Sequence, residues 1–472
     1  MDNLENFWSA VDGHPSLTHH IRSKPGYKRT LVPLGLHGDG VPLTGRGKVW
    51  QQGFTNFSFF SLVGQGNTGE LLFYIWGLFE KLKYLEHEAN STLTRAFAIL
   101  RWSFQALFEG VWPSRNHLGE LFPANSQAGK KAGQRLAGPY SAVFFALLGD
   151  LDFYAGTMGL PRSSLASGPC WLCRCQKWGA QSWQNFRRDA PWIQTMWSAQ
   201  AWKNWAGKSP CELFRLDWFS ALNIAPDYMH NKYLGGDQFF YASILYLLTH
   251  HLLHSDEHQN MLQVWKEIQE VYRSEEIPCR YRYLNTVRMF LRRNNTLKLK
   301  GKASEIRFLH LPLLRVWEAH MVPGVQVHRK IHLALKLNAL LEGLLIDFKG
   351  FVALPPQAAQ QFEEAMSAFL LLVSELKAHF EDDDNDIRLF TTTEKHHFLQ
   401  HTAKFSATIN PRMLWAFAGE DQQRRAQTLA HAGTWTIKSV HQDRPSVQAC
   451  PPPAFQVAQA VRKNLSQKAF EP

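Results

Sequence analysis

The sequence predicts an α/β fold in which a strand-rich first part is followed by a large, mostly α-helical region. Two apolar runs, "LVPLGLHGD" and "AVFFALLGD", have the length and composition of buried strands, and each ends in Gly-Asp. Between residues 238 and 380, almost every stretch has instead the period of an amphipathic helix. The change of character near residue 160 therefore separates a sheet region from a helical region.

The first part of the chain contains the predicted sheet. Residues 1–28 are polar and look irregular. One strand is expected at 29–37 and one or two more, rich in Phe and Val, within 48–64, with the glycines of a tight connection between these two regions. Helices are expected at 71–86 and 92–112, the second with Ser91 or Thr92 as its N-cap. A buried strand at 141–149 completes the order strand, strand, strand, helix, strand.

The second part begins with a Trp-rich, basic segment. Residues 171–218 hold eight of the seventeen Trp residues, interleaved with Arg and Lys. Helices are expected at 238–253, 260–274, 325–348 and 355–380, and an acidic stretch at 381–386 separates them from the last part of the chain. A last helical region is expected at 411–432, and the Pro-rich end of the chain has the composition of a loose tail.

Composition limits the kinds of protein that this chain can be. The formal net charge of +11 favours an anionic partner, most commonly nucleic acid. Six Cys in 472 residues exclude a secreted disulfide framework. No signal-peptide pattern is evident, and no uncharged apolar run has the roughly 18–20 residues of a membrane helix. We expect a soluble intracellular protein with reduced thiols and no membrane partner, in the nucleus or the cytoplasm.

The two Gly-Asp endings are the first chemical signal. A carboxylate directly after a buried strand lies at the edge of the sheet, where ligands and metals gather in open α/β folds. If the strands are neighbours, Asp39 and Asp150 come together, and a shared divalent cation relieves their repulsion. This arrangement suits two-metal phosphoryl transfer, which normally requires a third carboxylate. The alternative is that each Asp only begins a turn.

Several short motifs occur in a recognisable order. They are "HGDGVPL", "LLGDLDFYAGTMGLP", "PCWLCRC", "PDYMHNKYLGG", "KHHFLQH" and "LWAFAGEDQQ". In order and spacing this series resembles the DDE transposases of eukaryotic cut-and-paste elements, most closely the CACTA-type and related superfamilies, over about residues 30–430. Those proteins carry an Asp after a strand, a second Asp after a later strand, a Cys-x-x-Cys, a Met-His or Asp-x-x-His motif, a helical insertion and a late Glu.

The resemblance implies which residues are catalytic. The first acid falls on Asp39, the second on Asp150 with Asp152 as its rival, and the third on Glu420 with Asp421 as its rival. Asp150 is preferred to Asp152 because it directly ends the apolar run, as Asp39 does. The three acids would hold Mg²⁺, or Mn²⁺ in its place.

The resemblance also implies a ribonuclease H-like fold, with a mixed five-stranded sheet interrupted by a large, mostly α-helical insertion. The core would begin at 29–160, after the irregular segment 1–28. The insertion would span 161–390, the late catalytic helix would complete the core within 391–440, and the loose tail would occupy 441–472. The 38 residues before Asp39 show no zinc-finger or helix-turn-helix pattern, so a truncated or domesticated copy is an alternative.

The cysteines predict a structural zinc site. Cys170 and Cys173 have the spacing with which two sulfurs reach one tetrahedral zinc ion. The other ligands would come from farther along the chain, in the order His230, then Asp227 or Cys175, with His396, His397 and His401 as weaker options. The alternative is a pair of buried thiols, with His230 satisfying backbone groups near a helix start.

The Trp-rich segment also offers contacts to DNA. Arg187 and Arg188 are the preferred candidates for phosphate binding. The tryptophans could stack on bases, but most of them are expected to form the core of the helical region, because Trp is first of all a large apolar side chain.

Three functions remain open at this stage. The first is a transposase-like enzyme that cleaves and transfers DNA strands by Mg²⁺-dependent two-metal phosphoryl transfer. The second is a catalytically decayed, transposon-derived DNA-binding protein. The third is a helical scaffold with no nucleic-acid role, which predicts that Asp39 and Asp150 lie far apart. The target DNA sequence and the oligomeric state, including a homo-oligomer, are not specified by the sequence.

Overall fold

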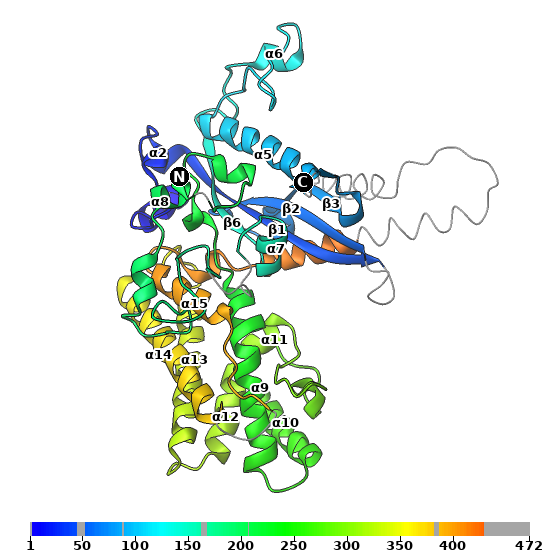
Figure 1. Ribbon diagram of the computed structural model, residues 1–472, viewed down its shortest axis with the longest axis vertical. Helices are drawn as coiled ribbons and strands as arrows, with labels where there is room; N and C mark the ends of the chain where they lie inside the picture. Colours follow the sequence, from blue (N-terminus) through cyan, green and yellow to red (C-terminus); the bar gives the residue numbers. More distant parts are fainter. Residues whose placement is uncertain are drawn as a thin grey trace, which may run out of the picture. The chain divides into compact units, whose positions relative to one another are not determined.

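The structure is a computed structural model that describes residues 2–44, 52–86, 89–161, 168–205, 207–381 and 387–428. The chain divides into two compact units. The first unit comprises Met1–Arg162, Trp197–Ala225 and Ala416–Pro472, and the second comprises Ser163–Met196 and Pro226–Trp415. The main sheet belongs to the first unit and most of the long helices to the second (Figure 1). The tail predicted at 441–472 lies outside the described residues.

A four-stranded mixed sheet with the order β3-β2-β1-β6 forms the centre of the first unit. β1 (Leu31–Thr44), β2 (Gln52–Ser61) and β3 (Phe73–Phe79) pair antiparallel, whereas β6 (Ser141–Leu148) lies parallel to β1. The prediction that the strands near 30–38 and 141–149 are parallel neighbours is confirmed. A separate two-stranded pairing joins β4 (Leu85–Glu86) and β5 (Ala89–Asn90).

The outer edge of β6 carries one further bridge. Leu147 and Ile224 form an isolated parallel bridge, in which the backbone N–H of Ala225 donates to the carbonyl oxygen of Leu147 over 3.0 Å. Next to it, the side chain of Asn223 donates to the carbonyl oxygen of Phe145 over 2.8 Å. The backbone at Ile224 and Ala225 therefore adds one parallel bridge at the outer edge of β6, while the sheet itself has four strands.

Residues 71–86 are not the helix that the sequence predicts, because they contain the whole of β3. Aromatic cross-strand pairs explain the difference. The ring of Trp76 stacks on Phe57 with a centroid distance of 5.6 Å, and Phe73 stacks on Phe59 at 5.3 Å. Pairs of this kind stabilise a sheet directly and override the local tendency of a segment to form a helix.

Helices cover the sheet of the first unit. The predicted helix at 92–112 is confirmed, and Phe104 on it stacks on Phe144 of β6 with a centroid distance of 4.7 Å. The helices of this unit are α1 (Asp2–Ala10), α2 (His19–Arg22), α3 (Tyr27–Thr30), α4 (Thr68–Leu71), α5 (Ser91–Glu109), α6 (Gln127–Lys131), α7 (Leu151–Gly156) and α8 (Ala199–Asn204). A further helix runs through residues 417–428.

Residues 1–28 contain helices rather than the irregular chain expected from their polarity. Phe7 and Trp8 on α1 are completely buried. The ring of Trp8 meets Phe145 edge-on at 5.6 Å, and its Nε1–H donates to the carbonyl oxygen of Leu31 over 2.8 Å. The N-terminal segment is therefore part of the core around β1 and β6.

The second unit is built mainly from helices, as predicted. They are η5 (Met229–Gly236), α9 (Asp237–Leu247), η6 (Leu248–Leu252), α10 (Glu257–Ser274), α11 (Ala303–Arg307), α12 (His310–His320), α13 (Gln326–Asp347), α14 (Pro356–Glu381) and α15 (Glu394–Phe405). Trp171 and Trp192 are buried in it, in agreement with a core role. Within the described ranges, no helix combines the length and apolar character needed to cross a membrane.

Candidate functional site

Asp39 lies inside β1 rather than at its end, so the strand is longer than the sequence predicts. Antiparallel pairing with β2 carries β1 on to Thr44 and places Asp39 opposite Asn56. The parallel pairing with β6 stops earlier, at the pair of His37 and Leu148. Asp39 therefore lies just beyond the point where the two parallel strands separate.

The parallel register brings Asp39 to Asp150. Continuing it by two residues from the pair of His37 and Leu148 places the two aspartates side by side. The backbones remain close over this interval, because a Cβ atom added to Gly149 would lie 2.8 Å from the carbonyl oxygen of Gly38. The two Gly-Asp sequences are thus neighbours in space although 111 positions separate them in the chain.

The glycines of both sequences make room for Phe153. A Cβ atom at Gly38 would lie 2.2 Å from one atom of the Phe153 ring. A Cβ atom at Gly149 would lie 2.3 Å from another atom of the same ring. Side chains alternate between the two faces of extended backbone, so Asp39 points to the face opposite this ring. One ring on one face thus explains why the residue before each aspartate is glycine.

Asp150 has a structural role as well. It is the N-cap of α7, and its Oδ1 atom accepts a hydrogen bond from the backbone N–H of Phe153 over 2.6 Å. One of the two carboxylate oxygens of Asp150 therefore has the structural role that the alternative interpretation predicts, in which the aspartate begins a turn. Asp152, its rival, lies exposed in the first turn of α7.

The helix at 417–428 lies on the face of the sheet that carries Asp39. His37 is two residues before Asp39 and shares its face, and a Cβ atom on Gly419 would be 2.2 Å from the His37 ring. Asn56, the register partner of Asp39, donates a hydrogen bond from Nδ2 to Oε1 of Gln423. The helix is therefore held against the sheet on both sides of Asp39.

Among the described residues, Asp39, Asp150 and Glu420 do not form a group whose carboxylate oxygens lie within 4.8 Å of one another, although Glu420 lies on the helix packed over the face of Asp39. Glu420 directly follows Gly419, lies one turn before Gln423 and is half-buried. Asp421 instead forms ion pairs with Arg424 at 2.5 Å and Arg425 at 3.1 Å. Partial burial acts to raise the pKa of Asp421, but the hydrogen bond from Arg424 and the charge of Arg425 outweigh it and lower the pKa. Asp421 therefore already has its cationic partners.

Replacing Gly419 with alanine is expected to destabilise the first unit. Alanine favours a helix over glycine by about 1 kcal/mol, but the added methyl group would collide with the His37 ring, and overpacking costs about 1–3 kcal/mol. Gly343 in α13 is the matched control, because a Cβ atom there meets nothing within 4 Å. Thermal unfolding should show a lower midpoint for Gly419→Ala and a higher one for Gly343→Ala. Equal stabilisation by both would contradict the packing of this helix on His37.

A second cluster of chemically active side chains lies in the second unit. Single ligand atoms of Cys170, Cys173, Cys175 and His397 all lie within 4.8 Å of one another, and all four residues are buried. The Sγ atom of Cys173 is 3.3 Å from Nε2 of His397. His401 adjoins this group, with its Nε2 atom 3.5 Å from Sγ of Cys170 and 3.0 Å from Nε2 of His397.

The local structure explains how these ligands converge. His397 and His401 are four residues apart on α15 and so share one face of the helix. The ring of Trp192 packs edge-on against both, with centroid distances of 4.4 and 5.0 Å. The cysteines approach from an extended segment, in which Cys173 forms a bridge with Met196. Aromatic packing thus closes the cluster from water.

One of the three clustered thiols favours the charged form. Burial acts to raise the pKa of the Cys173 thiol, but hydrogen bonds from Cys170, Cys175 and His397 outweigh it and lower that pKa, which favours a thiolate. Burial raises the pKa of Cys170. The hydrogen bond with Cys170 acts to lower the pKa of Cys175, but the hydrogen bond with Cys173 and burial outweigh it and raise that pKa. Burial also lowers the pKa of His401, which favours the neutral imidazole. Thiolate and neutral imidazole are the forms in which these residues bind metal. The four clustered residues could therefore hold a structural metal ion.

Of the further ligands that the sequence predicts, Cys175 belongs to the cluster, whereas the preferred His230 and the alternative Asp227 do not. His230 and Asp227 instead interact with each other through Nδ1 and Oδ2, and Asp227 also accepts a hydrogen bond from the backbone N–H of Met229 over 3.0 Å. His397 and His401, which the sequence ranks lower, lie at the cysteines. Their four-residue spacing, which places two side chains on one face of a helix, is the signal that could have identified them, although the sequence analysis predicts no helix over 394–405.

The two arginines predicted to contact DNA lie on the surface of the second unit. Arg187 lies 3.6 Å from Asp189, and Arg188 lies 3.4 Å from Glu364. Both guanidinium groups are well exposed, and exposed ion pairs contribute little free energy. Phosphate groups could therefore replace these carboxylates as partners.

Comparison with known proteins provides no family for this chain. No protein-family model matches it, and no curated protein sequence is significantly similar to it. Its function is therefore argued from the two sites themselves.

Proposed function

We propose that this chain is a transposase-like protein that cleaves and joins DNA strands by two-metal phosphoryl transfer. The observation that carries the proposal is the pair of Gly-Asp sequences on adjacent parallel strands, with a helix bearing a third carboxylate packed over the same face. A helical scaffold would give the two aspartates no reason to be neighbours. Like charges in such a position are favourable mainly when a cation binds them.

The sheet supports a ribonuclease H-like fold for the first unit. Such a fold has a mixed sheet of five strands. The order β3-β2-β1-β6 supplies four of them, and Ile224 adds one parallel bridge at the outer edge of β6. The two aspartates lie two residues beyond the last register pair of the parallel strands β1 and β6. The helical second unit would then be the main part of the insertion.

Asp39, Asp150 and Glu420 are the residues that would hold Mg²⁺ or Mn²⁺. When bound, such ions activate the attacking oxygen and stabilise the leaving oxygen of a phosphodiester. The chain itself positions the acids. The hydrogen bond from Phe153 fixes one oxygen of Asp150, and the contacts of Gly419 and Gln423 fix the helix of Glu420.

The cluster of Cys170, Cys173, Cys175 and His397 fits zinc best among the common metals. Thiolate and imidazole ligands in a closed, buried site are typical of structural zinc. His401 competes with Cys175 for the fourth ligand position, because it touches both Cys170 and His397. The ion would join the cysteine segment to α15 within the second unit.

The direct test is cleavage of DNA by the purified chain. Supercoiled DNA should be nicked in the presence of Mg²⁺ or Mn²⁺ and remain intact when neither is added. If the wild-type chain binds DNA but never cuts it under any divalent ion, the catalytically decayed, DNA-binding alternative is correct instead.

Binding to duplex DNA is expected to weaken steeply with salt, because each neutralised phosphate releases counterions. Replacing Arg187 and Arg188 together with alanine should reduce the slope of log affinity against log salt by about 1.8, or two contacts at about 0.9 each. Fluorescence anisotropy over a salt series measures this slope. A flat salt response of the wild-type chain would favour the scaffold instead.

A further inference from the structure

A basic segment of the second unit has no role in the sites above. Residues 277–304 contain eight cationic side chains and no Asp or Glu. They are Arg280, Arg282, Arg288, Arg292, Arg293, Lys298, Lys300 and Lys302. Such a run of one sign is costly through self-repulsion unless an anionic partner neutralises it.

The basic segment is flanked by three glutamates, Glu275, Glu276 and Glu305. Its own cations form no ion pairs with them among the described residues. None of the eight side chains forms an ion pair within the part of the chain that the structure describes. Elsewhere in the same unit, Arg188, Arg307 and Arg315 each have a carboxylate partner. Burial and the neighbouring charge of Arg292 lower the pKa of Lys298, as expected where like charges accumulate. The cations of the basic segment are therefore available to bind an anion from outside the chain.

The basic segment is nevertheless well anchored. Leu284, Phe290 and Leu299 within it are completely buried. The backbone N–H of Leu299 donates to the carbonyl oxygen of Gln238 on α9 over 3.0 Å, and that of Lys300 donates to Met289 over 2.8 Å. Apolar side chains thus face inward, and most of the cations face the solvent from a defined backbone.

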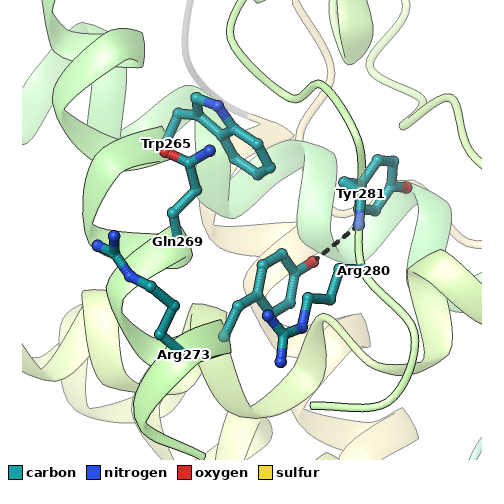
Figure 2. A pocket seen from close by; sticks show the side chains of 6 residues that line it. Trp265, Gln269, Arg273, Arg280 and Tyr281 are labelled. Atoms are coloured by element: carbon teal, nitrogen blue, oxygen red, sulfur yellow. Dashed lines mark hydrogen bonds between the residues drawn. The ribbon is translucent and has the colours of Figure 1, made fainter. Parts of the chain in front are cut away.

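A pocket lies where the basic segment meets α10, and we call it the α10 pocket. Figure 2 shows Trp265, Gln269 and Arg273 on one side and Arg280 and Tyr281 on the other. With Tyr272, these residues line an open depression with a volume of about 200 Å³. Four of the lining residues are on α10, and three of them, Trp265, Gln269 and Arg273, are spaced four apart and so share one face of the helix.

The floor of the α10 pocket is aromatic and its rim is cationic. Trp265 and Tyr281 are only 8% and 5% exposed, whereas Arg273 and Arg280 are exposed. Nε of Arg280 donates to the carbonyl oxygen of Ile277 over 2.7 Å, which orients its guanidinium group. The hydroxyl of Tyr272 accepts a hydrogen bond from the backbone N–H of Tyr281 over 3.4 Å, which fixes the far wall.

This combination of groups selects a particular ligand chemistry. Guanidinium groups accept a phosphate, and Gln269 can pair with the polar edge of a base, while the nearly buried aromatic side chains offer only a small apolar contact to a flat ring. The volume of about 200 Å³ is below the roughly 300–1,000 Å³ of pockets that enclose a whole small molecule. The ligand is therefore one unit of a chain that continues outside the pocket.

We propose that the α10 pocket binds one unpaired nucleotide of a DNA strand, whose neighbouring phosphates lie along the basic segment. The choice of DNA rests on the proposed function. A base within a duplex is stacked and cannot enter a pocket, so the partner is single-stranded DNA or a duplex with an unpaired nucleotide.

Binding of a fluorescently labelled single-stranded oligodeoxynucleotide tests the proposal, using the full chain without added divalent ions. Replacing Arg273 and Arg280 together with glutamine should reduce the salt slope by about 1.4, or two contacts at about 0.7 each. The matched control is Arg315→Gln with Arg329→Gln, two exposed arginines outside the pocket, which should leave the slope unchanged. Equal slopes for both double variants would overturn the proposal, as would tighter binding of the RNA strand of the same sequence.

Photo-crosslinking distinguishes the pocket from a general basic surface. A DNA strand with one 4-thiothymidine should crosslink to a peptide that contains Trp265, Tyr272 or Tyr281. If crosslinks are found only in other peptides, the proposal that the α10 pocket binds a nucleotide is wrong. DNA cutting is scored separately. If the pocket variants bind like wild type while the wild-type chain cuts DNA, this inference fails and the proposed function stands. If the pocket variants lose binding but neither the wild-type chain nor any variant cuts DNA, the proposed function fails and this inference stands.

Discussion

Replacing Asp39 or Asp150 with asparagine, or Glu420 with glutamine, is expected to abolish Mg²⁺- or Mn²⁺-dependent cleavage of DNA. Each substitution removes a negative charge from the place where the cations would bind. The loss should exceed the roughly 10–100-fold that is typical of residues that only support a metal ligand. The measurement is the rate of nicking of supercoiled DNA by each purified variant.

The substitutions are chosen so that folding is preserved. Asparagine is as good an N-cap as aspartate, so Asp150→Asn can keep the hydrogen bond from Phe153 that begins α7. The unfolding midpoint of this variant should therefore stay close to that of the wild type. A loss of cleavage without a loss of stability then identifies a ligand rather than a turn residue.

Two neighbouring acids provide matched controls. Asp152 is exposed in the first turn of α7, and Asp421 is paired with Arg424 and Arg425. Asp152→Asn and Asp421→Asn should both retain cleavage. If Asp150→Asn still cuts and Asp152→Asn does not, the second acid has been assigned to the wrong residue. If all five variants cut like the wild type, the acids do not hold the catalytic ions.

The sequence predicts the neighbouring aspartates well because the signal is local. An apolar run that ends in Gly-Asp occurs twice, and the same physical demand explains both occurrences. Each glycine makes room for the ring of Phe153, and each aspartate follows it onto the opposite face. Two backbone segments whose glycines both contact the ring of Phe153 must lie next to each other. A repeated short sequence can therefore predict a contact between residues 111 positions apart.

The errors of the sequence analysis come from interactions that are distant in the chain. Residues 71–86 have the period of a helix, but Trp76 and Phe73 find aromatic partners on β2, which the sequence does not reveal. The partners of Cys173 and Cys170 among the histidines lie 224 and 231 positions away. Sequence reasoning favoured the nearer His230, whose partner is Asp227.

Replacing Cys173 with serine is expected to remove zinc from the protein and to destabilise the second unit. The wild-type chain should contain about one zinc ion, since the buried sulfurs and imidazoles converge on one point. The free energy of binding a structural zinc ion contributes directly to folding, so its loss should lower the unfolding midpoint markedly. Metal analysis by mass spectrometry and thermal unfolding, each with and without a chelator, measure the two effects.

Two further comparisons make the zinc prediction specific to the cluster. Cys279→Ser is the matched control, because Cys279 belongs to the same unit but not to the cluster, and it should retain both zinc and stability. Cys175→Ser and His401→Ala separate the two candidates for the fourth ligand, since the variant that loses zinc identifies it. A chelator should lower the midpoint of the wild type and leave that of Cys173→Ser unchanged. Equal zinc in the wild type and Cys173→Ser, or none in either, would mean that the cluster is a group of buried thiols and imidazoles that Trp192 merely packs against.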